Sequence, residues 1–244
     1  MEKNENLEIF ICTHKDFCKP VCSKVYKVIN CKDIDYNTPS GLKDEFYSEI
    51  YTYLYLADKV ELKDYVGLCH YRRYWGFMDE IPDMDEIFKK YDIIVPIPVN
   101  FGESVKKQYA RGHNIEDLNI VTDILNKKFP SYANIWNSFL NGSLMISYNM
   151  MIVRKELFLD YVSFIKAMME EYLKEVGKDI RKRVLDNKEK YLKSFSPLNE
   201  VEYQVRVGSF LIERLTNAWI IANCPKKKWM NVVRTEVKYK NIES

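Results

Sequence analysis

The most informative segment of the chain is residues 70–74, HYRRY, which places one imidazole, two guanidinium groups and two phenols side by side. An enzyme that releases a nucleoside diphosphate must stabilise the negative charge developing on that leaving group. Preorganised cations and hydroxyls can do this, as a metal ion can. Arg72 and Arg73 stand out because lysine outnumbers arginine 28 to 9 here, and the guanidinium fork suits phosphate. The alternative is that both arginines form surface ion pairs while the tyrosines pack.

Histidine gives a second indication of a site, because the chain has only His14, His70 and His113. His14 and His70 follow short apolar runs, residues 7–12 and 65–69, that indicate buried strands. Open α/β sheets bind ligands beyond the carboxyl ends of their strands, so these two histidines are candidates for one site. His113 lies in a polar stretch. Each histidine could also be an ordinary polar residue satisfied by its neighbours.

The elements that must position these residues alternate between strand and helix patterns. Strands are expected at 7–12, 65–69, 92–98, within 143–154 and at 231–240. Helices are expected at 41–59, 83–91, 158–172 and in the charged stretch 174–193, and Asn199 is expected to cap a last long helix. This alternation predicts an α/β fold with a mostly parallel sheet flanked by helices. We expect one domain over residues 1–244, with a charged helical excursion around 174–195.

Two Asp-x-Asp sequences, residues 33–35 and 83–85, match the motif with which many nucleotide-sugar transferases hold a divalent metal. Asp83 is better explained as a helix cap, because Glu86 three residues later completes a capping-box pattern. Residues 33–35 lie in a loop of turn-like composition. We therefore assign no metal ligand, and a requirement for Mn²⁺ or Mg²⁺ stays open.

The composition argues against several protein classes. A formal net charge of +2 is too small to indicate a nucleic-acid binder. No apolar run reaches the roughly 18 residues needed to span a bilayer, and the polar start lacks a signal-peptide pattern, which predicts a cytoplasmic protein. The six cysteines include no C-x-x-C pair, which favours reduced thiols over a zinc site. The lysines of 174–193 and 226–228 are either solvated surface or a peripheral contact with anionic lipid.

Glu213 and Arg214 lie among apolar residues of the last predicted helix. A carboxylate at the edge of a cleft can act as a general base, and Arg214 would keep it ionised. Alternatively the two residues brace the site, or they simply face solvent. We expect Glu213 at the cleft edge.

Residues 65–74 (YVGLCHYRRY) closely resemble the hallmark of a bacterial capsule-biosynthesis glycosyltransferase family, catalogued as domain of unknown function 4422. Further segments resemble this family in the same order along the chain, and they are residues 11–15, 49–55, 92–96, 149–156 and 206–215. The loop at 35–41 departs from the family because it is shortened, which bears on the identity of the donor. The resemblance implies a GT-A-like fold and transfer of a sugar from a nucleotide-sugar onto a growing surface glycan. Some members are linked to galactofuranose transfer.

From the residues and the resemblance together, we predict a UDP-sugar donor and a lipid-linked or oligosaccharide acceptor at the inner membrane face. Glu213 and His70 are the expected catalytic residues. The expected substrate-binding residues are Thr13, His14, Lys15, Tyr71, Arg72, Arg73, His113, Asn149 and Arg214. The rival functions are a nucleotide-sugar or glycan binding protein without catalysis and a metal-dependent phosphohydrolase. An RNA-binding module is a more distant rival, because no basic stripe is present.

Overall fold

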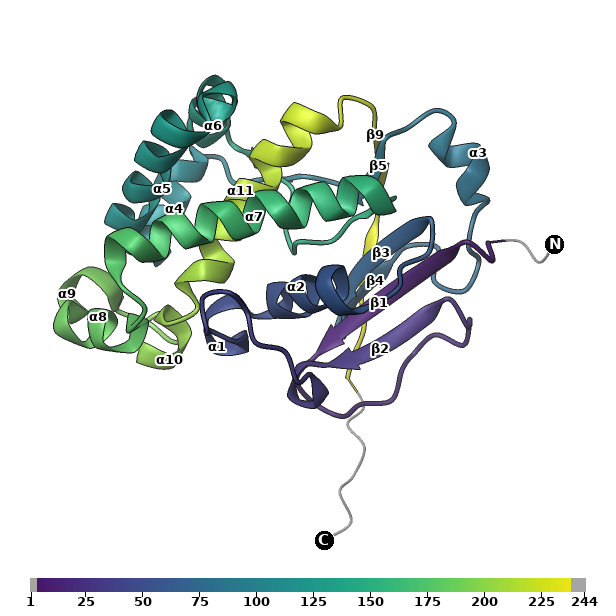
Figure 1. Cartoon of the computed structure of the whole chain (residues 1–244), viewed down its shortest axis with the longest axis horizontal. Helices are drawn as coiled ribbons and strands as arrows, with labels where there is room; N and C mark the ends of the chain where they lie inside the picture. The colour runs from purple at the N-terminus through teal and green to yellow at the C-terminus, as the bar shows by residue number, and fades with distance from the viewer. Residues whose placement is uncertain (1–3, 238–244) are drawn as a thin grey trace, which may run out of the picture.

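The computed structural model describes residues 4–237, and its central feature within them is an eight-stranded sheet (Figure 1). Six strands lie side by side in the order β2 (Tyr26–Asn30), β1 (Leu7–Thr13), β3 (Tyr65–His70), β8 (Ile152–Arg154), β5 (Ile93–Pro96) and β9 (Lys227–Met230). All six run in one direction except β8, which is antiparallel to both of its neighbours. The predicted α/β class with a mostly parallel sheet is therefore confirmed.

Two short strands extend the sheet beyond the end of β3. β4 (Arg73–Trp75) turns back from β3 and pairs through Arg73 and His70, and β10 (Val232–Arg234) adds to β4 in antiparallel fashion. The strand predicted at residues 231–240 is shorter in the structure, because β10 spans only Val232–Arg234 of the described part, and residues 238–240 lie outside the described residues. β6 (Val99–Asn100) and β7 (Leu144–Met145) form a separate two-stranded antiparallel sheet.

The sheet is buried on both faces, which explains its continuous apolar runs. Along β1, Ile9 and Ile11 face one hydrophobic core, whereas Phe10 and Cys12 face the other. Gly67 on β3 is required by this packing, because a Cβ there would lie 2.7 Å from Cγ1 of Ile9.

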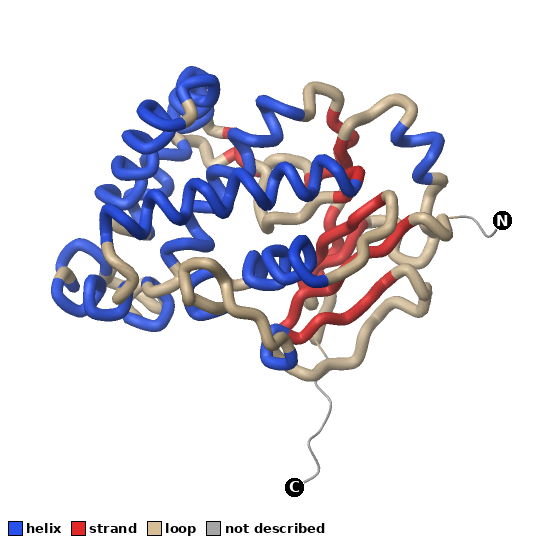
Figure 2. Tube along the Cα trace, in the orientation of Figure 1, coloured by secondary structure: helices blue, strands red, loops and turns tan. Residues whose placement is uncertain are grey.

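Helices cover the sheet and continue past it into a separate helical half of the molecule (Figures 1 and 2). α2 (Glu49–Lys59) packs on β1, and α7 (Lys155–Val176) packs on β3. α11 (Val207–Asn223) contacts α1 (Asp44–Tyr47), α6 (Pro130–Asn141) and α7, so it joins the two halves. The helical half contains α4 (Val105–Gly112), α5 (Ile115–Lys128), α6 (Pro130–Asn141), α8 (Ile180–Asp186), α9 (Lys188–Tyr191) and α10 (Val201–Gln204).

Three predictions about elements need correction. The single helix expected at 41–59 is split into α1 and α2, because Ser48 has a φ of +50° that no α-helix contains. Asn199 does not cap a long helix: Glu200 precedes the one-turn α10, and α11 begins only at Val207. The strand β9 was missed because its lysines indicated surface rather than sheet.

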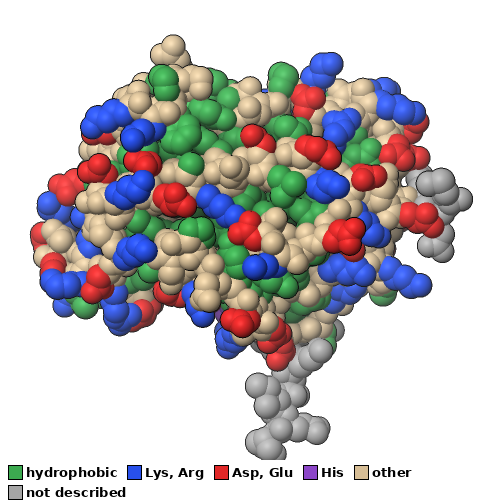
Figure 3. Space-filling view, in the orientation of Figure 1, with side chains coloured by type: hydrophobic (Ala, Val, Ile, Leu, Met, Phe, Trp, Pro, Cys, Tyr) green, Lys and Arg blue, Asp and Glu red, His purple; other side chains and the backbone are tan. Residues whose placement is uncertain are grey.

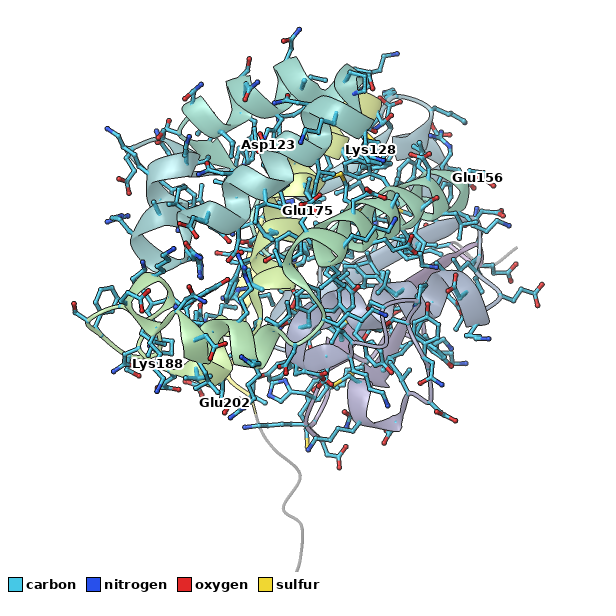
Figure 4. All side chains as sticks on the ribbon, turned by 60° about the vertical axis from the view of Figure 1, so that its left-hand side comes forward. Asp123, Lys128, Glu156, Glu175, Lys188 and Glu202 are labelled. Atoms are coloured by element: carbon cyan, nitrogen blue, oxygen red, sulfur yellow. The ribbon has the colours of Figure 1, made fainter. Side chains whose placement is uncertain are left out.

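The charged stretch after α7 is helical, as expected, and most of its cations are paired. Lys182 bonds Asp186, Arg181 bonds Glu202, and Lys190 reaches across to Glu116 on α5. In Figure 4, Lys188 and Glu202 lie at the outer end of this helical half, and Figure 3 shows acidic and basic side chains interspersed over the visible face. None of the helices within residues 4–237 is both long and apolar enough to cross a membrane.

Candidate active site

A cavity of about 260 Å³ opens where β1 and β3 end, at the edge of the sheet that the sequence indicated. The strand ends supply His14, His70 and Arg72. Asp44 and Glu49 come from α1 and α2, and Arg206 comes from the turn before α11. Residues from five segments thus meet around one small space.

The turn after β1 presents His14 to the cavity. The Thr13 hydroxyl accepts a hydrogen bond from the Lys15 amide at 3.1 Å and donates one to the Lys15 carbonyl at 2.7 Å. This local pairing tightens the turn in the way that threonine favours. Thr13 and His14 both line the cavity, whereas the exposed Lys15 side chain does not. Tyr71 is buried beneath them, with its ring 5.3 Å from that of His14 and outside the cavity lining.

His70 is a neutral hydrogen-bonding group. Its Nδ1 accepts from the Arg72 backbone N–H at 3.4 Å, so Nε2 carries the proton and can donate. Burial, followed by the charges of Arg72 and Arg73, lowers the pKa of His70 to about 3. Partial burial and the nearby Lys15 and Arg72 also lower the pKa of His14. Both rings are therefore suited to donate to an anion without adding charge.

Two arginines bring positive charge to the cavity. The Arg206 Nε donates to the Ser48 hydroxyl at 2.8 Å, and its guanidinium lies against Tyr203 and Phe210. The Arg72 guanidinium lies 5.0 Å from the Tyr71 ring centroid. Within residues 4–237, neither arginine has a carboxylate within the 4.0 Å of an ion pair. Among the described residues, the cavity therefore holds two guanidinium groups that form no ion pair, although the carboxylates of Asp44 and Glu49 also line it.

Adjacent Arg72 and Arg73 point to different places, because Arg72 lies in the turn between β3 and β4 whereas Arg73 begins β4. Arg72 lines the cavity. Arg73 does not, and its guanidinium lies 4.3 Å from the ring centroid of Tyr148.

Glu49 is a functional candidate that the sequence reasoning did not single out. It is the first residue of α2, it lines the cavity, and one of its oxygens accepts from the Asn149 amide at 2.9 Å. Burial raises the pKa of Glu49, while Asn149 and Arg206 act in the opposite direction. Glu49 and Arg206 both begin segments that resemble the family, so a signal for them was present.

Glu213 braces a neighbouring turn and does not line the cavity. One oxygen accepts from the Tyr148 backbone N–H at 2.9 Å, and the other accepts from Arg214 at 2.9 Å. Tyr148 and the buried Asn149 both have left-handed backbone, with φ of +79° and +51°. Of the roles considered for Glu213, these contacts favour bracing over proton transfer.

The structure does not bring His113 or Arg214 to the cavity. Arg214 is 2% exposed and donates to the Phe210 carbonyl and the Gln108 side chain. His113 is buried and stacks on Phe210 with ring centroids 4.0 Å apart. Its Nδ1 lies 3.3 Å from Oε1 of Gln204. Both Arg214 terminal nitrogens and the His113 Nδ1 have partners in the core, and neither residue lines the cavity, so the expected contact with substrate draws no support from this geometry.

The Asp-x-Asp segments also lie outside the cavity lining. Asp83 caps α3 (Met84–Phe88) by accepting from the Glu86 backbone N–H, as the capping-box pattern predicted, and Asp85 accepts from the Tyr65 hydroxyl. Within the described part of the chain, no group of three or more His, Cys, Asp or Glu side chains could hold a metal ion. All six cysteines are free thiols.

The sheet and its cationic cavity define an α/β protein with a candidate ligand site at the ends of its strands. Residues 8–224 match the family described as "Domain of unknown function (DUF4422)", and the chain belongs to that family. It is also similar to a solved structure, the apo form of the WbbM bifunctional glycosyltransferase, with a TM-score of 0.73 and 20% identity. That alignment covers 96% of this chain and 46% of the other, so this chain spans less than half of that protein's length. No curated protein matches the sequence.

Proposed function

We propose that the protein is a glycosyltransferase whose cavity binds the diphosphate of a nucleotide-sugar donor. The observation that carries this proposal is the pair of arginines, Arg72 and Arg206, which face one cavity without ion-pair partners among the described residues. The fold shared with a glycosyltransferase and the family resemblance support the same class.

The chemistry follows from the lining of the cavity. When the bond between the sugar and the diphosphate breaks, negative charge grows on the phosphate oxygens. The guanidinium groups of Arg72 and Arg206 and the Nε2–H of neutral His70 are fixed donors for that charge. Because they are held before the reaction by their contacts with Tyr71, Ser48 and the Arg72 backbone, little reorganisation is needed.

The finer parts of the proposal rest on the family resemblance. It favours a UDP-sugar donor, with galactofuranose among the candidate sugars. The acceptor would be a lipid-linked or oligosaccharide intermediate of a surface glycan, and the transfer would take place in the cytoplasm. A peripheral contact with anionic lipid draws less support, because Lys227 and Lys228 are half-buried in β9. Lys228 also lies against the Tyr91 ring.

The test combines donor binding with turnover. Titration calorimetry should show UDP binding to the protein, and Arg206→Ala should weaken it by about tenfold or more, since a hydrogen bond to a charged group is worth roughly 1.5–3 kcal/mol. Arg181→Ala is the matched control, because Arg181 is exposed, pairs with Glu202 and does not line the cavity. Absence of UDP binding by the wild-type protein would overturn the proposal.

Turnover then separates the rival functions. A glycosyltransferase should transfer sugar from a UDP-sugar to an acceptor, or hydrolyse the donor slowly when no acceptor is present. Binding without any turnover would indicate a binding protein. Release of phosphate that requires a metal, without sugar transfer, would indicate a phosphohydrolase.

A further inference from the structure

Two carboxylates line the cavity, and they are held differently. Asp44, in the first turn of α1, accepts from the Cys31 thiol at 3.3 Å. Glu49 begins α2 and accepts from Asn149, a side chain brought from a hundred residues away. Only Glu49 is thus fixed by a long-range contact dedicated to it.

Asn149 is itself held by hydrogen bonds at its side-chain oxygen, its side-chain nitrogen and its backbone carbonyl. Its Oδ1 accepts from the Thr216 hydroxyl at 3.2 Å, which orients the amide so that Nδ2 faces Glu49. The Tyr53 hydroxyl donates to the Asn149 backbone carbonyl at 2.8 Å. A side chain bonded through both its oxygen and its nitrogen can hold a carboxylate in one orientation.

Glu213 completes the arrangement from α11. Its bond to the Tyr148 N–H holds the turn at the residue before Asn149, where two successive residues are left-handed. For residues other than glycine that backbone is costly, and it persists where surrounding contacts enforce it. The path from Glu213 through Tyr148 and Asn149 therefore ends at the Glu49 carboxylate.

We propose that Glu49 is the general base of the transfer reaction and that Asn149 and Glu213 are its positioning residues. This proposal rests on the proposed function. The acceptor hydroxyl gives its proton to the Glu49 carboxylate while its oxygen forms the new bond to the anomeric carbon. The bond from that carbon to the diphosphate oxygen breaks, and its electron pair leaves with the nucleoside diphosphate. Arg72 and Arg206 stabilise the departing charge.

The other groups at the cavity are poorer bases. Burial and the neighbouring Arg72 and Arg73 lower the pKa of His70 to about 3, and burial with Lys15 and Arg72 lowers the pKa of His14. Both oxygens of Glu213 are occupied, outside the cavity lining. A base works best when its pKa approaches the operating pH, and burial moves the pKa of Glu49 upward in that direction.

The pH dependence of this base reflects charges from every element around it. The titratable and charged groups that share the cavity with Glu49 are Cys12, His14, Cys31, Asp44, His70, Arg72 and Arg206. Tyr53 on α2, Tyr161 on α7 and Glu213 on α11 also interact with it electrostatically. Arg206 favours the ionised carboxylate and Glu213 opposes it. Asn149 donates to the ionised form, so its removal should raise the pKa of Glu49.

The first experiment is Glu49→Gln, which preserves shape and the bond from Asn149. We expect UDP affinity within about threefold of wild type and sugar transfer reduced by about 10²–10⁴-fold, the usual size of a general-base contribution. Glu45→Gln, an exposed carboxylate on α1, is the matched control and should transfer normally. Asp44→Asn, measured in parallel, should lose less activity than Glu49→Gln.

The second experiment tests positioning through the pH profile. In Asn149→Ala, the acid limb of kcat should move to higher pH, because a base with a raised pKa is ionised only at higher pH. Glu213→Ala should lower kcat while UDP affinity is kept, and Glu213→Gln, which can still accept from Tyr148, should restore most of it. A merely structural role would leave the acid limb in place.

The outcomes separate the two proposals. If the wild-type protein binds no UDP, the proposed function fails. If UDP binds normally and folded Glu49→Gln keeps more than about a tenth of wild-type transfer, where a general base should cost 10²-fold or more, the assignment of Glu49 is wrong while the function stands. A larger loss in Asp44→Asn than in Glu49→Gln would move the role of base to Asp44.

Discussion

The cavity edge and the helical half contain the same kinds of buried polar group but use them differently. Each has a histidine whose pKa is lowered to about 3, His70 in the cavity and His113 in the helical half. In the helical half, Asp117 is fully buried and its Oδ1 accepts from Tyr172 and Arg183, at 2.8 and 3.0 Å. Those charges neutralise each other, whereas Arg72 and Arg206 face open space.

The difference shows that a perturbed pKa alone does not identify a functional site, since structural networks perturb pKa values as well. What distinguishes the cavity is that Arg72 and Arg206 form no ion pair within residues 4–237 and lie around a space that a ligand can enter. The helical half has the opposite property, because the buried Asp117 is paired with Arg183 inside the fold. Changes in the two regions should therefore have separable effects on stability and on ligand binding.

The largest expected effect lies in the helical half, and it is on stability. Asp117→Ala leaves Arg183 partly buried without its partner, and breaking a buried pair in this way costs about 3–5 kcal/mol. The melting temperature should fall by on the order of 10 °C. UDP affinity of the folded protein should be unchanged. Asp123→Ala, at an exposed position of the same helix (Figure 4), is the control. Loss of UDP affinity in Asp117→Ala would break the separation between the regions.

The next effect is on activity at the cavity edge. Arg72→Ala should reduce sugar transfer by about 10²–10³-fold, because it removes a donor aimed at charge in the transition state. Arg73→Ala removes only the contact with Tyr148, worth roughly 0.5–1 kcal/mol, so its loss should be less than about tenfold. If steady-state kinetics showed equal, small losses of sugar transfer in the two variants, Arg72 would not be the residue that stabilises the diphosphate.

A smaller effect is expected where the two regions join. A Cβ at Gly208 of α11 would press into the Phe46 ring of α1, and such overpacking costs about 1–3 kcal/mol. Because Ser48 and Arg206 flank this contact, UDP binding should weaken as well. Gly112→Ala, whose Cβ would meet nothing nearer than 3.9 Å, should leave melting temperature and binding almost unchanged. Normal UDP affinity in Gly208→Ala would show that the packing of α11 against α1 does not determine the position of the Arg206 side chain.

The sequence was sufficient to predict the strands that end at the cavity. The apolar runs before His14 and His70 fix β1 and β3, and parallel strands bring their carboxyl ends to one edge. The alternation of side chains also predicted that Arg72 and Arg73 would separate. These are local consequences of chain geometry, and local patterns encode them.

The remaining site residues depend on long-range packing that no local pattern encodes. Glu49 meets Asn149 across a hundred residues, and Arg206 meets Ser48 across an even longer separation. Glu213 was expected at the cleft edge because its helix neighbours are apolar. Its carboxylate instead accepts a hydrogen bond from the backbone N–H of Tyr148 in the left-handed turn. His113 follows no strand, and its neighbours in the sequence are polar. They gave no sign that its ring stacks on Phe210, which is distant in the sequence.

The most direct test of the cavity as a diphosphate site uses the three histidines as built-in reporters. Their imidazole NMR resonances should be assigned at neutral pH by single substitutions and followed during titration with UDP. The account predicts that the His14 and His70 resonances shift as UDP binds, because the diphosphate lies beside both rings, while the buried His113 resonance stays in place. Shifts at His113 without shifts at His14 and His70 would contradict it.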